Sequence, residues 1–246
     1  LQYNDIHPSS SGEIGQRLSS SFIFIRTESP PNNQPLINPM VVLALKKGDL
    51  THFLYEASSS IHISSLVSEI CQIYNGRLKI LRIIDHISEL SAHGLSLPPE
   101  MQGLTDEQIS ELKLIDEWGE KCIPSGGFIY NRDDLGRRNG KAPNKNMVDV
   151  LKRTQDEAKS LISMDLVKKS KPLKMVDINE AIMMLNGALT IVYPMGLPPH
   201  EPIRMEFDNI EDLSGTQASM EVIPPNECTL WFCGKEMLSA KCLFDY

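Results

Sequence analysis

Residues 40–56 read MVVLALKKGDLTHFLYE, and this stretch decides the fold expected for the N-terminal part of the chain. Met40 to Lys46 is apolar and rich in β-branched residues, which favours a strand. Lys47–Gly48–Asp49 supplies a turn, and Thr51 to Glu56 alternates as a returning strand. The sequence therefore predicts a β-hairpin.

A helix is expected directly after this hairpin. Ser64 or Ser65 can cap it, and its apolar face carries Leu66, Val67, Ile70, Ile73 and Tyr74. Asn75–Gly76 is expected to end the helix, because both residues tolerate the left-handed conformation of a helix C-terminus. Leu78 to Ile84 then reads as a further strand or helix start. A hairpin, a helix and a strand open a ubiquitin-like β-grasp fold, so we expect an α+β fold with this unit at residues 40–97.

A mainly helical domain is expected at residues 98–246, after the boundary Pro98–Pro99. Capping boxes are predicted at Thr105 with Gln108 and at Asp177 with Glu180, and Asn144 is predicted to cap the longest helix. An irregular, proline-rich segment is expected at residues 193–203. Beyond it, Met205 to Phe207 reads as a short strand and Leu230 to Leu243 as a last helix.

Residues 1–39 differ in composition from the rest, with serine and proline clusters and no sustained periodicity. We expect a disordered leader or the product of an over-long gene model. The net charge of −8 argues against a nucleic-acid-binding protein. Apolar stretches such as Ala188 to Tyr193 are shorter than the roughly 18–20 residues of a membrane span. Five cysteines without CxxC pairs favour reduced structural thiols in the cytoplasm.

The candidate catalytic motifs lack the spacing that their chemistry needs. The glycines of the loop 124–143 form no phosphate cradle, and Ser214–Gly215–Thr216 is no nucleophile elbow. Asp116, Glu117 and Glu120 have the spacing of a solvated helix face, and Cys122 has no neighbouring histidine to activate it. We therefore expect no enzyme, no cofactor, no metal and no small-molecule substrate.

The proline-rich segment Tyr193 to Pro199 is the most informative candidate for binding. Its prolines preset the backbone, so it loses little entropy when it docks. Either the segment packs rigidly on its own domain, or it offers a preformed apolar contact to a partner. The basic loop between Arg132 and Lys145 fits a salt-bridged surface or a partner contact. The residues predicted to contact a protein partner are Trp118, Arg137, Arg138, Tyr193, Met195, Leu197 and Arg204.

Several separated runs, taken in order, resemble one family. They are Tyr74–Lys79, Leu97–Asp106, Asp116–Cys122, Gly136–Gly140, Ile191–Pro199, Pro202–Phe207 and Glu211–Ala218. This set resembles the Kurly family of cilia- and flagella-associated proteins, over about residues 40–246. Members of that family continue beyond Tyr246 into a charged tail, which would then be missing here.

The resemblance implies a non-catalytic cytoplasmic factor for the assembly of axonemal outer dynein arms, needed for motile cilia. It also implies a link to cilium positioning and planar cell polarity, and a location in the cytoplasm and at the basal body. The expected partners are dynein chains, assembly factors or chaperones, with no nucleic acid and no membrane. The alternative is a stable structural component of the axoneme or basal body, for which Arg132 to Lys145 is the basic surface available to acidic tubulin.

Overall fold

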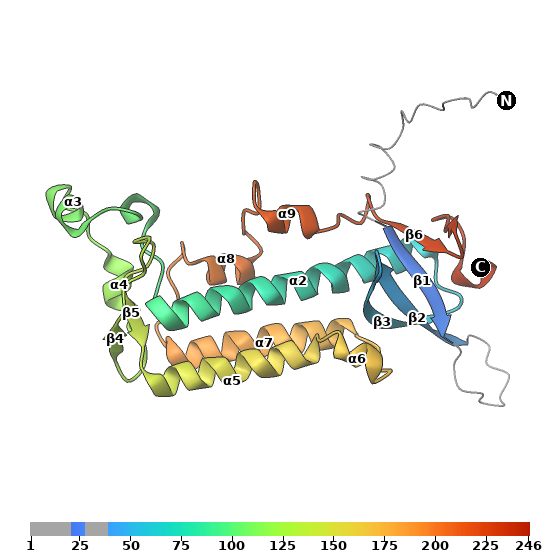
Figure 1. Ribbon diagram of the computed structural model, residues 1–246, viewed down its shortest axis with the longest axis horizontal. Helices are drawn as coiled ribbons and strands as arrows, with labels where there is room; N and C mark the ends of the chain where they lie inside the picture. Colours follow the sequence, from blue (N-terminus) through green and yellow to red (C-terminus); the bar gives the residue numbers. More distant parts are fainter. Residues whose placement is uncertain (1–20, 28–38) are drawn as a thin grey trace, which may run out of the picture. The chain divides into compact units, whose positions relative to one another are not determined.

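A computed structural model describes residues 21–27 and 39–246 (Figure 1). The fold is α+β, as expected, with a strand hairpin that is followed by helices and small sheets. Two compact units divide the chain. Of the described residues, unit 1 holds 21–27, 39–75, 163–175 and 222–246, and unit 2 holds 76–162 and 176–221. These units cut across the expected ranges 40–97 and 98–246, because the C-terminal segment returns to the N-terminal sheet.

Unit 1 is built on a five-stranded sheet with the order β3-β2-β1-β6-β7. Its expected hairpin is confirmed: β2 (Met40–Lys47) pairs antiparallel with β3 (Leu50–Ser58), and Gly48 takes the positive φ of 62° that the tight turn requires. Leu45, Leu66 and Ile70 are fully buried, so the hairpin and the following helix share one core. The remaining strands are β1 (Ser21–Thr27), β6 (Thr229–Phe232) and β7 (Lys235–Glu236).

The two ends of the chain meet in this sheet. β1 pairs antiparallel with β2 and parallel with β6, in the register Phe24↔Phe232. Part of the leader expected at residues 1–39 is therefore a strand; apart from Pro39, the rest lies outside the described residues. The prediction of a last helix at Leu230 to Leu243 is wrong, since this region forms β6, β7 and the start of the short 3-10 helix η2 (Leu243–Asp245). Pairing with a distant strand overrides the local helical pattern.

Helix α2 (Ile63–His93) does not end at Asn75–Gly76 but continues for 31 residues in all, contributing to both units. The side chain of Asn75 exchanges two hydrogen bonds with the backbone of Ile223, at 2.8 and 3.0 Å. A Cβ atom added to Gly76 would lie 2.7 Å from Cγ2 of Ile178. Asn75 therefore holds the C-terminal segment by hydrogen bonds, and Gly76 allows Ile178 to approach α2 closely. Neither residue ends the helix.

Unit 2 is a helical layer in which α2, α5 (Lys145–Leu161) and α7 (Met175–Val192) run side by side (Figure 1). Arg77 Nε donates to the carbonyl of Ile162 at 3.1 Å, which ties α2 to the end of α5. The fully buried isoleucine and leucine side chains of α2 in this unit are Ile80, Ile83, Ile84, Ile87 and Leu90. Burial of each of these side chains stabilises the folded state by about 1.5–3 kcal/mol, because its apolar surface is removed from water.

The first residues of α5 and α7 can be compared with the capping residues predicted from the sequence. Asn144 caps α5, as expected, by accepting from the N–H of Met147 at 3.2 Å. The prediction that this helix is the longest is wrong, because α5 has 17 residues and α2 has 31. α7 begins at Met175, so the capping box expected at Asp177 is wrong; Asp177 lies in the first turn, where a carboxylate suits the helix dipole. By length and composition α7 could span a membrane, a test that core helices of globular proteins also pass; it buries Ile178, Ala181, Leu185, Ala188, Leu189 and Val192.

Short elements complete the two units. The capping box expected at Thr105 and Gln108 is confirmed and opens α3 (Asp106–Glu111). The strand expected at Met205 to Phe207 is wrong, because α8 (Pro202–Asp208) covers it and starts with Pro202, which is preset for a first helical position. The other elements are η1 (Pro99–Met101), α4 (Glu117–Lys121), β4 (Phe128–Tyr130), β5 (Lys141–Pro143), α6 (Asp165–Lys168) and α9 (Gln217–Glu221).

Candidate functional site

All residues predicted to contact a partner belong to unit 2. Met195 is accessible, with 72% of its surface exposed, and Arg137 and Arg204 are exposed as well. Trp118 is 38% exposed and Leu197 is partly buried. The last two of the predicted set, Tyr193 and Arg138, are buried.

The proline-rich segment is held at both of its ends. Its first residue extends the last turn of α7, where the N–H of Tyr193 donates to Leu189 at 2.7 Å. Gly196, at a φ of 80°, turns the chain, and its N–H donates to Tyr193 at 2.9 Å. Arg204 Nη1 of α8 donates to the carbonyl of Leu197 at 2.8 Å. Met195 therefore stands at the apex of a braced turn, as a preformed apolar contact requires.

A pocket of about 360 Å³ lies beside this turn, between the end of α7 and α8. Tyr193, Leu197 and Arg204, which are three of the predicted residues, line it together. Arg204 Nε also lies 3.5 Å from Oδ2 of Asp208, so its guanidinium is shared between the loop and its own helix. The other lining residues are Asn186, Leu189, Thr190, Gly196, Phe207 and Asp208. Such a pocket can accept a side chain of a partner protein.

A buried ion pair anchors the segment between the turn and α8. The carboxylate of Glu201 is fully buried and accepts from the N–H of Ser96 at 2.7 Å. Arg138 Nη1 lies 3.5 Å from Glu201 Oε1 and donates to the carbonyl of Gly94 at 2.7 Å. His200 Nε2 makes a further contact of 3.0 Å with the carbonyl of Ser96. The loop that follows α2 and the segment that precedes α8 are thereby fixed to each other.

Burial gives Tyr193 and Arg138 internal roles, which corrects their expected place on the surface. Tyr193 is 1% exposed and Arg138 is 6% exposed, so neither presents its side chain to solvent. Burial, and then the nearby Glu201 carboxylate, raise the pKa of the Tyr193 phenol, which stays protonated. The side chain of Arg138 contacts Gly94 and Glu201 inside unit 2, and the ring of Tyr193 lies in the core. Whether the accessible residues contact a partner stays a prediction.

Helix α8 is fixed to α2 by a second ion pair. Arg82 reaches both carboxylate oxygens of Glu206, with distances of 2.6 and 2.9 Å. Burial raises the pKa of Glu206, and the hydrogen bonds from Arg82 work in the opposite direction. Bidentate geometry of this kind fixes orientation as well as distance. The surface that α8 contributes is therefore rigid.

Trp118 and Arg137 lie on separate parts of unit 2. Trp118 belongs to α4, and Lys121 Nζ lies 5.7 Å from the centroid of its ring, a cation–π contact. Arg137 donates its backbone N–H to the carboxylate of Asp133 at 2.9 Å, while its side chain is exposed. Among the described residues, no hydrogen bond, ion pair or ring contact joins Trp118 or Arg137 to the Met195 turn, so the predicted residues form more than one cluster.

Asp116 and Cys122, which were considered for catalysis, have structural roles in the fold. Asp116 caps α4 by accepting from the N–H of Gly119 at 2.9 Å. Cys122 is buried, and this burial, together with the Asp116 charge, raises the pKa of its thiol. A protonated thiol is a poor nucleophile. Over residues 21–27 and 39–246, no group of three or more histidine, cysteine, aspartate or glutamate side chains has the geometry of a metal site.

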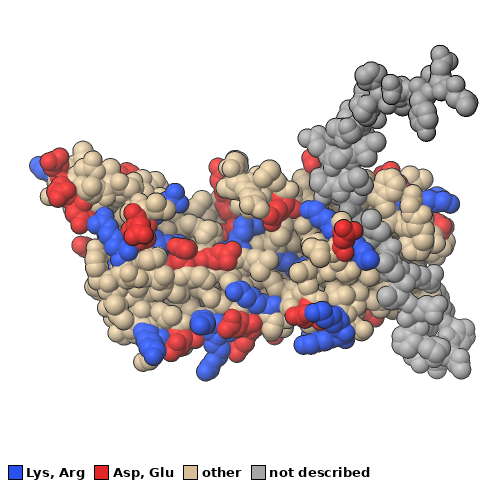
Figure 2. Space-filling view, viewed as in Figure 1, with Lys and Arg blue, Asp and Glu red and all other residues tan. Residues whose placement is uncertain are grey.

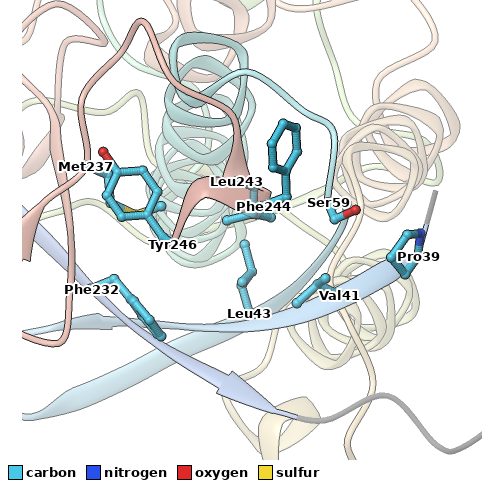
Figure 3. Close-up of a pocket in the computed structure, with 9 residues that line it drawn as sticks. All are labelled: Pro39, Val41, Leu43, Ser59, Phe232, Met237, Leu243, Phe244 and Tyr246. Atoms are coloured by element: carbon cyan, nitrogen blue, oxygen red, sulfur yellow. The ribbon is translucent and has the colours of Figure 1, made fainter.

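Unit 1 carries an apolar pocket of about 180 Å³ that the sequence did not indicate (Figure 3). Figure 3 shows Val41 and Leu43 of β2 beneath the C-terminal residues Leu243 and Phe244. Pro39, Ser59, Phe232, Met237 and Tyr246 complete the lining. Because its walls are about two hundred residues apart in the chain, local sequence signals could not have revealed it.

Charges on the face drawn in Figure 2 are mixed in sign, without one continuous basic field.

The sequence is similar to curated proteins from several animals. "Cilia- and flagella-associated protein 298" of Rattus norvegicus is 54% identical over 207 residues, which cover 84% of this chain and 71% of the relative. The proteins of the same name from Homo sapiens and Drosophila melanogaster are 53% and 50% identical, with the same coverage of each chain. No protein-family model matches the sequence, and no solved structure matches the fold.

Proposed function

Since the chain belongs to the cilia- and flagella-associated protein 298 family, we propose that it is a non-catalytic cytoplasmic factor for the assembly of axonemal outer dynein arms. The observation that carries the proposal is the identity of about half of the residues to cilium-associated relatives over most of the chain. The names of those relatives directly support a cilium-related role. The proposal also includes membership of the Kurly family, a location at the basal body and a link to planar cell polarity.

The physical basis of this role is a rigid surface that offers apolar contacts. Met195 lies at the apex of a turn that Arg204 braces through its hydrogen bond to the carbonyl of Leu197. A partner that covers Met195 and fills the adjacent pocket pays little ordering entropy, because the turn is already fixed. Binding free energy at interfaces concentrates in a few such side chains.

The test replaces the protein in ciliated cells that lack it. Met195→Glu puts a charge at the apex of the turn, while the control Met183→Glu puts the same charge on α7 at a residue that is 73% exposed. We expect Met195→Glu to lose outer dynein arms in electron micrographs and to lose co-purification with dynein chains or their assembly factors, and Met183→Glu to keep both. Normal arms with both variants would count against the Met195 turn, and normal arms in cells without the protein would refute the dynein-arm role.

The alternative, a stable component of the axoneme or basal body, predicts another distribution after detergent extraction. An assembly factor stays in the soluble fraction, whereas a lattice component sediments with the axonemes. The basic surface proposed for tubulin is smaller than its sequence indicates, because Arg132 pairs with Asp106 at 2.6 Å and Arg138 is buried. This observation favours the assembly factor.

A further inference from the structure

Strand β4 has one edge without a partner strand among the described residues. It pairs only with β5, in a two-stranded sheet with the register Phe128↔Pro143, Ile129↔Ala142 and Tyr130↔Lys141. Neither a proline nor a charged side chain interrupts the three residues of β4, although these are the usual protections of an exposed edge. The edge is therefore able to accept another strand.

The register shows which backbone groups point outward. In an antiparallel pair, opposed residues alternate between those that exchange hydrogen bonds and those that do not. The backbone N–H of Asn131 donates to the carbonyl of Gly140 at 2.7 Å, so by the register Ile129 and Ala142, two residues away along each strand, stand at the next position whose backbone groups point inward. The N–H of Ala142 donates to the carbonyl of Gly140 at 3.0 Å. Lys141 agrees with this parity, since its N–H donates instead to Asn139 Oδ1 at 3.0 Å. The N–H and C=O groups of Phe128 and Tyr130 therefore point to the open edge.

The side chains around this edge are apolar and accessible. Phe128, Ile129 and Tyr130 are 44%, 58% and 65% exposed. Phe128 and Tyr130 share one face of the strand and Ile129 lies on the other, so an added strand would find apolar contacts on both faces. Lys141, opposite Tyr130, holds its Nζ 5.7 Å from the centroid of the Phe128 ring. The face with the two aromatic rings thus also carries a positive charge.

We propose that the β4 edge binds an extended, carboxylate-bearing segment of a partner protein, which becomes the third strand of the β4–β5 sheet. The outward backbone groups of Phe128 and Tyr130 form the hydrogen bonds of this added strand. An apolar residue of the partner packs on Ile129, and a carboxylate lies near Lys141 on the other face. Lys141 Nζ donates to the carbonyl of Gly119 at 3.1 Å, and no ion pair joins it to a carboxylate in the described part of the chain, so its positive charge is not neutralised.

A second copy of the chain fits this edge less well. Two β4 strands paired across a two-fold axis would bring Phe128 and Tyr130 of both copies to one face, together with both Lys141 ammonium groups. The two positive charges would repel each other, and β4 has no carboxylate to offset them. The proposal concerns a surface other than the Met195 turn and does not depend on a role in dynein-arm assembly.

Nuclear magnetic resonance on the full chain tests the proposal with defined probes. The probe is a short capped peptide that alternates valine and glutamate, compared with a valine–lysine peptide and with a valine–glutamate peptide that is N-methylated at every residue. We expect shifts of the β4 amides and slower exchange at Phe128 and Tyr130 with the first peptide. The lysine peptide should bind several-fold more weakly, and the N-methylated peptide should not bind.

Protein variants separate backbone pairing from nonspecific contact. Tyr130→Pro removes one outward N–H while leaving the Ile129 pair with β5, so affinity should fall about tenfold. Lys141→Glu should reverse the preference between the two charged peptides. Unchanged β4 amides with every peptide, equal binding of the N-methylated peptide, or a concentration-dependent dimer through β4 would each overturn the proposal. If Tyr130→Pro fails to fold, the N-methylated peptide still decides the outcome, because it leaves the protein unchanged.

Discussion

Replacement of Gly76 by alanine should destabilise the protein, although alanine is the better helix former. Gly76 lies inside α2, where the glycine-to-alanine change alone would stabilise a helix by about 1 kcal/mol. The new Cβ would lie 2.7 Å from Cγ2 of Ile178 on α7. Ile178 is fully buried and β-branched, so this methyl group has little freedom to move away. Overpacking of this kind costs about 1–3 kcal/mol, which leaves a net loss of up to about 2 kcal/mol.

Gly187→Ala is the matched control. Gly187 lies in α7, and a Cβ added there meets no atom within 4 Å. This variant should gain up to about 1 kcal/mol from helix propensity alone. Thermal unfolding of the full chain should therefore separate the two variants by about 1–3 kcal/mol, with Gly187→Ala above the parent protein.

A third variant identifies the contact itself. Ile178→Ala removes the crowding methyl group and by itself should cost about 2–5 kcal/mol, because it leaves a cavity. In that background Gly76→Ala should become stabilising. If Gly76→Ala stabilises the parent protein as much as Gly187→Ala does, α2 and α7 do not approach as closely as described, and the reasoning is refuted.

Glu201→Ala should lower the free energy of unfolding by about 3–5 kcal/mol, because Arg138 and the N–H of Ser96 lose their buried partner. Urea denaturation measures this loss. The double variant Glu201→Leu with Arg138→Met should lose less, because it leaves no unpaired buried charge. Burial raises the pKa of Asp133, but the N–H groups of Arg137 and Arg138, both at 2.9 Å, more than offset this and lower it. Because its pKa is lowered on folding, ionised Asp133 contributes to the free energy of unfolding. This contribution is complete above the unfolded pKa of about 4 and is lost as the pH falls through the folded pKa. The difference in urea midpoint between the parent and Asp133→Asn should therefore shrink below about pH 4, and a constant difference would contradict the assignment. Thr105→Val should speed amide exchange in α3 while Thr105→Ser should not, with little change in thermal midpoint for either, because α3 buries no residue.

Local signals in the sequence predicted much of the secondary structure. The hairpin at residues 40–56 follows from strand patterning and from one glycine at the turn. The caps at Thr105 and Asn144 follow from side chains that satisfy amides within three residues. The similarity to a cilium-associated family was also evident from the sequence, and about half of the residues are identical to the curated relatives.

The candidate site was only partly predictable. Met195 and Arg204 are exposed, as their predicted role requires, and the proline content around them indicated a rigid turn. Tyr193 reads equally well as an exposed anchor or as a core residue, because an aromatic ring suits both places. The apolar pocket of unit 1 and the open edge of β4 had no sequence signature, since neither accessibility nor strand order is encoded within a few neighbouring residues.

The sequence by itself determined those features whose interacting groups lie close together in the chain: turns, helix caps and the alternation of the first hairpin. Only the tertiary structure decided that Asn75–Gly76 continues a helix, that residues 229–232 form a strand and that Glu201 is paired inside the protein. The physical reason is the distance along the chain between the partners. Ile178 faces Gly76, β1 pairs with β6, and Arg138 faces Glu201, so each local conformation is selected by a contact that exists only after folding.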